Sequence, residues 1–209
     1  GGEGAEATVE KKISDLKENL EEKLSKTAQL SRLAQQVRVM RAPEGVRIDL
    51  VDDADFSMFA LGTTILTHEA RLLLEVLGQT LAEYQTPLIV RGHTDSLPWR
   101  DGRRTNNWSL STGRAEATRQ SLILNGMTAE RFARIEGVAD REPLIADNPK
   151  DPRNRRISLL MLENTGSGAG RGRRRPSRSV LTEEEIASAA EVSSGPDVVT
   201  NSEGTTGEP

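Results

Sequence analysis

Residues 88–114 read LIVRGHTDSLPWRDGRRTNNWSLSTGR, and this stretch predicts a strand, a polar loop and the start of a helix. Residues 88–90 form a short apolar run that Gly92 stops, which is typical of a buried strand. The hydroxyl side chains of residues 109–112 can begin a helix that continues to about residue 124. The loop between the two elements gathers arginine, tryptophan and asparagine residues that a folded core does not require. Such a loop is where we look first for a binding site.

Asp95 and Arg114 stand on the two sides of this loop, with Asn107 between them. In a strand-loop-helix unit the end of the strand lies beside the start of the helix, so both side chains can reach one ligand. Asp95 would accept hydrogen bonds from an ammonium group, while Arg114 would bind a carboxylate as a bidentate fork. Backbone N–H groups at the start of the helix would help to hold that carboxylate. The pattern therefore predicts a site for a zwitterion.

Three motifs resemble the OmpA-like family of peptidoglycan-binding domains. They are Gly-His-Thr-Asp at residues 92–95, Asn-x-x-Leu-Ser-x-x-Arg-Ala at residues 107–115, and Asn-Arg-Arg at residues 154–156. Trp108 and the long insert over residues 96–106 resemble the flagellar motor stator B subunit (MotB-like) branch of that family. The resemblance covers about residues 43–163, so the flanking segments are interpreted without it.

The resemblance implies that the site binds the diaminopimelate of a peptidoglycan stem peptide, which carries the paired ammonium and carboxylate groups. The expected peptidoglycan-binding residues are Asp95, Arg114, Asn107, Thr94, Leu97, Asn154 and Arg155, of which Thr94 and Leu97 would offer backbone contacts. Two alternatives stay open. Asp95 could cap a turn or pair with a neighbouring arginine, and Asn154 and Arg155 could serve only to orient Asp95.

Catalysis is not expected from this sequence. A zinc hydrolase needs several metal ligands, yet His68 and His93 are the only histidines and cysteine is absent. We interpret His93 as a hydrogen-bonded structural residue rather than a catalytic base. The acidic residues 52–55 suggest calcium, but they lack the spaced oxygen ligands and the glycine of an EF-hand loop. We therefore expect no metal, no cofactor and no enzyme activity.

The two tryptophans leave further alternatives. Trp99 and Trp108 could stack on sugar rings, or Trp108 could anchor the loop in the core. The aromatic and arginine content of the loop would also suit single-stranded nucleic acid. Because the net charge is -4 and the acid–base pair favours a zwitterion, we expect no nucleic-acid partner.

The composition predicts one packed core with poorly packed ends. Only 3% of the 209 residues are aromatic, which is low for a fully packed chain. We expect an amphipathic helical linker over residues 1–42, the OmpA-like peptidoglycan-binding domain over 43–163, and a disordered tail over 164–209. The basic cluster at residues 171–178 is interpreted as part of a solvated tail, with attraction to anionic wall or lipid surfaces as the alternative.

Residues 9–40 predict one long amphipathic helix. Apolar side chains recur at helical spacing, at Val9, Ile13, Leu16, Leu20, Leu24, Leu30, Leu33, Val37 and Met40. This stripe could pack on its own domain or form a self-associating coil. The resemblance implies a linker that helps the chain form a homodimer or repositions the domain.

The remaining pattern predicts an α/β fold of the α+β sandwich type, in the OmpA-like order β-α-β-α-β-β, preceded by the long amphipathic helix. The predicted elements are a strand at 46–51, a helix at 67–84, a strand at 88–90, a helix at 110–124, a helical turn at 128–132, and strands at 133–138 and 156–162. Helices are expected to pack on one face of a mixed sheet.

Together these features predict a non-catalytic wall anchor. The resemblance implies that the domain holds a flagellar motor stator to the cell wall in the periplasm, so that the motor can deliver torque for motility. We interpret Gly1-Gly2 as the start of a fragment, and expect an N-terminal inner-membrane helix and a stator A subunit to belong to the full-length assembly. The alternative is a general OmpA-like anchor of an outer-membrane protein or lipoprotein.

Overall fold

The computed structural model describes residues 2–97 and 106–163, which lie within one compact unit of the chain. The predicted tail at 164–209 and the loop residues Trp99, Arg100, Arg103 and Arg104 lie outside the described residues. Within the described ranges, no helix is both long enough and apolar enough to cross a membrane.

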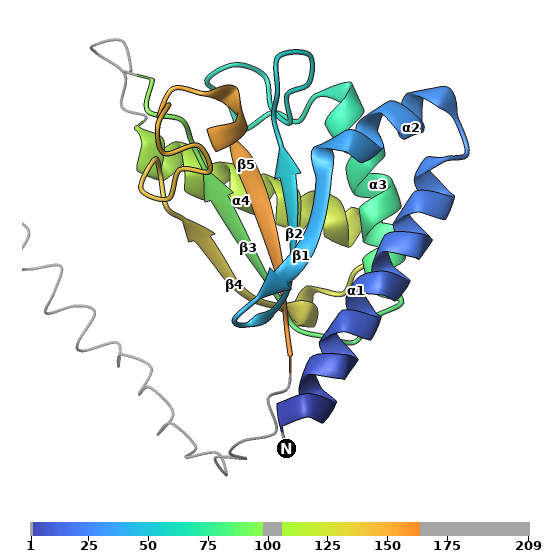
Figure 1. Ribbon diagram of the computed structural model, residues 1–209. Coiled ribbons are helices and arrows are strands. Elements are labelled where there is room, and N and C mark those ends of the chain that lie inside the picture. The colour runs from blue at the N-terminus through green and yellow to red at the C-terminus, as the bar shows by residue number, and fades with distance from the viewer. Residues whose placement is uncertain (1, 98–105, 164–209) are drawn as a thin grey trace, which may run out of the picture. The chain divides into compact units, whose positions relative to one another are not determined.

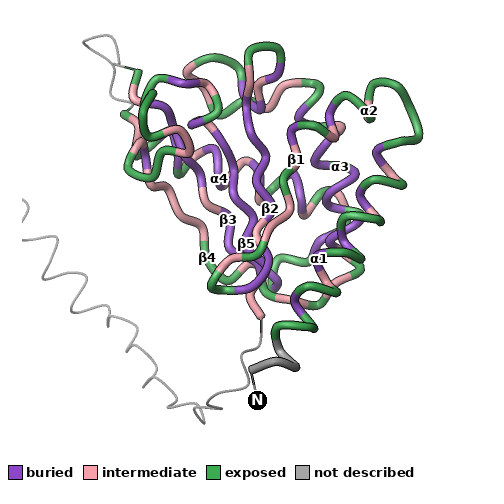
Figure 2. Tube along the Cα trace, viewed as in Figure 1, coloured by how far each residue is buried: buried purple, intermediate pink, exposed green. Residues whose placement is uncertain are grey.

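A mixed sheet forms the centre of the unit (Figure 1). Its strands are β1 (Val37–Ala42), β2 (Gly45–Val51), β3 (Leu88–His93), β4 (Phe132–Gly137) and β5 (Arg156–Leu162), in the spatial order β1-β2-β5-β3-β4. Only β3 and β4 pair in parallel, and the other neighbours are antiparallel. Figure 2 shows β2, β5 and β3 buried along most of their length, while β1 and β4 are more exposed. The predicted mixed sheet is confirmed.

Helices α3 (His68–Ala82) and α4 (Asn107–Leu124) lie against one face of this sheet (Figure 1). Leucines of α3 and the inward side chains of β2, β3 and β5 belong to one apolar cluster. Thr67 begins α3 as predicted, because its side chain accepts a hydrogen bond from the backbone N–H of Ala70. Short 3-10 turns occur at Ala34–Gln36, Ala129–Arg131 and Pro152–Asn154. The predicted α/β sandwich is confirmed.

The start of α4 differs from the prediction by three residues. Asn106 caps the helix by accepting from the backbone N–H of Ser109, and the Ser109 hydroxyl accepts in return from the backbone N–H of Asn106. This reciprocal pair is a capping box, in which the hydroxyl takes the third helical position rather than the cap. The helix ends as predicted at Asn125, followed by Gly126 with φ 108°.

The prediction of one helix over residues 9–40 is wrong beyond Leu24. Helix α1 (Gly2–Leu24) ends there, a second helix α2 (Ala28–Leu33) begins at a cap formed by Thr27, and residues 37–42 form the edge strand β1. Val37 and Val39 turn toward the core while Arg38 is exposed. The apolar spacing at 37 and 40 fitted a helix by coincidence, and the alternation at 37–39 was the correct signal.

The apolar stripe of α1 packs on its own domain, which was one of the two predicted alternatives. Val9, Ile13, Leu16, Leu20 and Leu24 are each at most 7% exposed and join the main core cluster. The contacts of α1 are chiefly with α3 and β1. Ion pairs between Lys12 and Glu163 at 3.2 Å and between Lys23 and Glu83 at 2.7 Å add polar contacts along its edges.

Candidate ligand-binding site

The predicted site lies where several chain segments meet at one edge of the sheet, at the top of Figure 1. Arg156, the first residue of β5, pairs with both Val51 at the end of β2 and His93 at the end of β3. This register places the loop after β2, the loop after β3 and the loop before β5 together. Helix α4 can lie close against β3 because Gly92 has no side chain, and a Cβ there would overlap the backbone oxygen of Ser111.

Asp95 is 7% exposed and is held from three directions. Its Oδ2 accepts a hydrogen bond from Nη1 of Arg155 at 2.8 Å. Its Oδ1 accepts a longer one from the backbone N–H of Leu97 at 3.3 Å, which resembles the turn-capping alternative. The side-chain amide of Asn107 donates to the backbone oxygen of Asp95 at 3.3 Å. The predicted neighbours Asp95, Asn107 and Arg155 are therefore in direct contact.

Arg155 bridges two carboxylates. Besides Asp95, its Nε donates to Oδ2 of Asp52 at 3.0 Å. Burial opposes the charge of Arg155, but the hydrogen bonds to Asp95 and Asp52 outweigh that effect and raise its pKa. Arg155 thus stays a cation that fixes the position of Asp95.

Arg114 is 5% exposed, and two contacts fix its guanidinium. Its Nε donates to the backbone oxygen of Thr63 at 2.9 Å, and its guanidinium carbon lies 5.0 Å from the centroid of the Phe59 ring. Burial lowers the pKa of Arg114, while the charges of Asp52 and Asp95 act to raise it. Neither Nη atom makes a hydrogen bond with any residue in the ranges 2–97 and 106–163. A ligand carboxylate could take both.

Asn154 has a different position from the one expected of a ligand contact. It is fully buried, its Oδ1 accepts from the backbone N–H of Ile145 at 2.7 Å, and its Nδ2 donates to the backbone oxygen of Asn148 at 2.9 Å. Its amide therefore organises the loop before β5. In this geometry Asn154 supports the site through Arg155, the next residue, and does not face the mouth.

The remaining predicted side chains differ in exposure. The backbone N–H of Thr94 donates to the backbone oxygen of Ala139 at 2.9 Å, which ties the end of β3 to the loop after β4. Leu97 is 44% exposed and Trp108 is 50% exposed, with the guanidinium carbon of Arg141 6.0 Å from the Trp108 ring centroid. Such exposure rules out the alternative that Trp108 anchors the loop in the core.

His93 has the character of a structural residue. It is 3% exposed, and its Nε2 lies 3.3 Å from the hydroxyl of Ser158. Burial, together with the positive charges of Arg156, Arg91 and Arg47, lowers the pKa of His93 to about 2. The ring is therefore neutral at physiological pH.

Asp52 has a role in the site that its sequence context did not predict, since the acidic run at residues 52–55 suggested only calcium. Asp52 accepts hydrogen bonds from Arg155, from the Ser57 hydroxyl at 2.7 Å and from the backbone N–H of Met58 at 2.9 Å. Asp53 accepts from Gln36 and from two backbone N–H groups in its own turn. Among the described residues there is no group of carboxylates and histidines arranged to hold a metal ion. The only available signal for Asp52 was its position directly after a strand.

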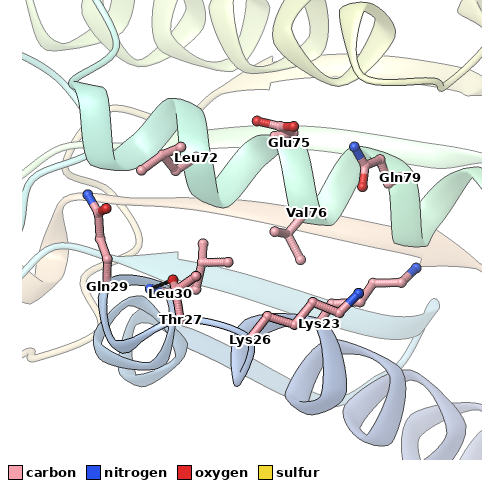
Figure 3. Close-up of a pocket in the computed structure, with 9 residues that line it drawn as sticks. All are labelled: Lys23, Lys26, Thr27, Gln29, Leu30, Leu72, Glu75, Val76 and Gln79. Atoms are coloured by element: carbon pink, nitrogen blue, oxygen red, sulfur yellow. Dashed lines mark hydrogen bonds between the residues drawn. The ribbon is translucent and has the colours of Figure 1, made fainter.

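A separate pocket of about 390 Å³ lies between the end of α1, helix α2 and helix α3 (Figure 3). Leu30 of α2 and Leu72 and Val76 of α3 are apolar side chains that line it from two sides, and Lys23 and Glu75 are among its polar lining residues. None of its lining residues belongs to the predicted site.

Comparisons with known proteins relate the chain to one family. Residues 58–156 match the model of the OmpA family. The chain is 29% identical over 159 residues to Motility protein B of Escherichia coli K12, an alignment that covers 76% of this chain and 52% of that protein. The chain thus spans about half the length of this curated relative.

Two solved structures share the fold. The cell wall anchor of the T6SS from Pseudomonas aeruginosa is 29% identical with a TM-score of 0.53, over 62% of this chain and 90% of that one. The periplasmic domain of Helicobacter pylori MotB has a TM-score of 0.53 over 80% of this chain and 94% of that one. Its identity is only 14%, so this second likeness shows the fold alone.

Proposed function

Residues 58–156 form an OmpA family domain, and from this premise we propose that the chain binds peptidoglycan through Asp95 and Arg114. The ligand is the diaminopimelate of the stem peptide. Its ammonium group donates to Asp95, and its neighbouring carboxylate accepts from the two Nη atoms of Arg114. The observation that carries the proposal is the state of Arg114, which is 5% exposed and held by Thr63 and Phe59, while neither of its Nη atoms donates to a residue in the ranges 2–97 and 106–163.

The charges of the site support a zwitterion. Asp52 and Asp95 contribute two negative charges, and Arg114 and Arg155 contribute two positive charges, so the four side chains are balanced. A ligand with one positive and one negative group keeps that balance when it enters. An isolated amine or an isolated carboxylate would leave one buried charge without a new partner, which is costly.

Binding without catalysis fits the same side chains. The histidine nearest to the site is buried and neutral, and Asp95 accepts a hydrogen bond from Arg155. A hydrolase would need a second carboxylate across a scissile bond or an activated water. The described site offers fixed hydrogen-bonding partners, which suit a domain that binds its ligand without reacting with it.

We assign the biological role from the relatives. Motility protein B of Escherichia coli is the basis for proposing a stator anchor in the periplasm, which holds the motor to the wall while torque is delivered. On this proposal the full-length protein has an inner-membrane helix, forms a homodimer and works with a stator A subunit. The second candidate is a general cell-wall anchor, favoured by the equally similar Pseudomonas aeruginosa T6SS anchor.

Co-sedimentation with purified peptidoglycan sacculi tests the binding function. The wild-type chain should sediment with sacculi, whereas Asp95→Ala and Arg114→Ala should remain in solution. Asp147→Ala serves as the matched control, because Asp147 is an exposed carboxylate on the loop between β4 and β5. Circular dichroism must show that each variant is folded. The proposal fails if folded Asp95→Ala sediments as well as the wild type.

A further inference from the structure

Asp52 is a buried carboxylate at the centre of the site that does not itself reach the mouth. It directly follows β2 and its side chain is 4% exposed. Its backbone N–H donates to the backbone oxygen of Arg155 at 3.1 Å, and its Oδ2 accepts from Nε of the same arginine. Asp52 and Arg155 are therefore joined by both main chain and side chain.

One arm of this arrangement leads to Asp95. Arg155 uses its Nε for Asp52 and its Nη1 for Asp95, so its guanidinium is fixed in a plane by two carboxylates. With only Asp95 as a partner, the guanidinium could rotate about a single hydrogen bond. Asp52 thus sets the orientation of the Arg155 guanidinium toward Asp95. That orientation determines how much of the Asp95 charge is available to a ligand.

The other arm leads to Arg114. Asp52 accepts from the Ser57 hydroxyl and from the backbone N–H of Met58, which fixes the start of the segment between β2 and α3. The next residue, Phe59, lies against the guanidinium of Arg114, and Thr63 in the same segment accepts from its Nε. Asp52 is also the first of the charges that favour the protonated form of Arg114, ahead of Asp95, against the effect of burial, which lowers its pKa.

We propose that Asp52 is a positioning residue for ligand binding, which sets Asp95 and Arg114 at the spacing required by neighbouring ammonium and carboxylate groups. This inference rests on the proposed function, and Asp52 makes no contact with the ligand in it. Loss of the Asp52 charge has a second consequence. The four side chains then carry a net positive charge, so the site should favour a dicarboxylate relative to a zwitterion.

Asp52→Asn tests this role, because it keeps the shape of the side chain and removes its charge. Calorimetric titration would compare diaminopimelic acid with pimelic acid, which lacks both amino groups. We expect Asp52→Asn to lower the affinity for diaminopimelic acid by roughly tenfold or more, as for the loss of a charge-assisted hydrogen bond. Its affinity for pimelic acid should stay the same or rise. If the substitution only loosened the structure, it would lower the affinity for both ligands together.

Asp53→Asn is the matched control, since Asp53 is the next carboxylate and also holds the loop through backbone N–H groups, but does not contact an arginine of the site. It should leave the ratio of the two affinities unchanged. The inference is overturned if Asp52→Asn has the wild-type ratio, or if Asp53→Asn shifts the ratio equally.

A ligand-free measurement separates this inference from the proposed function. In NMR spectra, the Nε–H signals of Arg155 and Arg114 should both shift in Asp52→Asn, while that of Arg131, which donates to the backbone oxygen of Thr86, should not. Unchanged Arg155 and Arg114 signals would overturn the Asp52 arrangement even if the wild type binds. Absence of wild-type binding to sacculi and diaminopimelic acid would instead overturn the proposed function.

Discussion

Acidification should destabilise this domain through His93, well before its carboxylates are protonated. The ring lies at the end of β3, 3% exposed, among Arg156 of β5, Arg91 of β3 and Arg47 of β2. Its pKa is lowered from 6.5 to about 2 by burial and by those three cations. In the unfolded chain the histidine regains its ordinary pKa.

The sign follows from proton binding. Between pH 6.5 and about pH 2 the unfolded chain binds a proton that the folded chain does not, so the free energy of unfolding falls as the pH falls. Protonation of this histidine in the unfolded chain lowers the free energy of unfolding by about 1.4 kcal/mol for each pH unit below 6.5. The loss between pH 7 and pH 5 is therefore about 2 kcal/mol. Glu116 and Asp151, whose pKa values are lowered to about 2 by their arginine partners, add their losses chiefly below pH 5.

Urea denaturation at pH 7 and pH 5 measures this loss. In His93→Gln the loss between the two pH values should shrink to a few tenths of a kcal/mol, because no buried imidazole remains to discriminate between folded and unfolded chains. His68→Gln is the matched control, since His68 is exposed at the start of α3 and its removal should leave the loss unchanged. The reasoning is refuted if His93→Gln loses as much stability as the wild type over this interval.

Three further substitutions examine other parts of the structure. Gly92→Ala should lower the free energy of unfolding by about 3 kcal/mol in urea denaturation, because its Cβ would overlap the backbone of Ser111 and separate α4 from β3; wild-type stability would show that α4 can move away freely. Leu16→Ala should lower the free energy of unfolding by about 2–5 kcal/mol, because Leu16 on α1 is fully buried against the domain, and a loss below 1 kcal/mol would mean that α1 is not docked in solution. Trp108→Ala should weaken binding to sacculi by about two- to tenfold and leave calorimetric binding of free diaminopimelic acid unchanged, since an exposed indole can meet only the larger ligand; an equal loss for both ligands would place Trp108 in the zwitterion site instead.

The position of the site could be predicted because it depends on local order in the chain. Asp95 follows a strand and Arg114 lies in the next helix, and this connection brings their main chains together whatever the loop between them does. The partner of Asp95 was suggested only by the family resemblance, in which Arg155 could orient Asp95. Arg155 reaches Asp95 across 60 residues, through the pairing of β3 with β5, which the sequence pattern does not specify.

Asp52 shows the limit more sharply. In the sequence it belongs to an acidic run that suggested only an incomplete calcium site. Its burial follows from the antiparallel pairing of β2 with β5, which sets Val51 opposite Arg156 and so places Asp52 beside Arg155. Strand order is a long-range property, and therefore neither the charge nor the spacing of the acidic run could reveal this contact.

The packing of α1 constrains how two copies of the chain could associate. The apolar stripe that suggested a self-associating coil is already buried against α3 and β1, with Leu16 fully inaccessible and Leu20 at 3% exposure. The same side chains cannot pack in a coiled-coil seam and in this core at once. A homodimer of the docked form must therefore use another surface, whereas a dimer built on the α1 stripe requires α1 to leave the domain and expose the core beneath it. The two arrangements differ in stability and cannot be populated equally without a compensating interface.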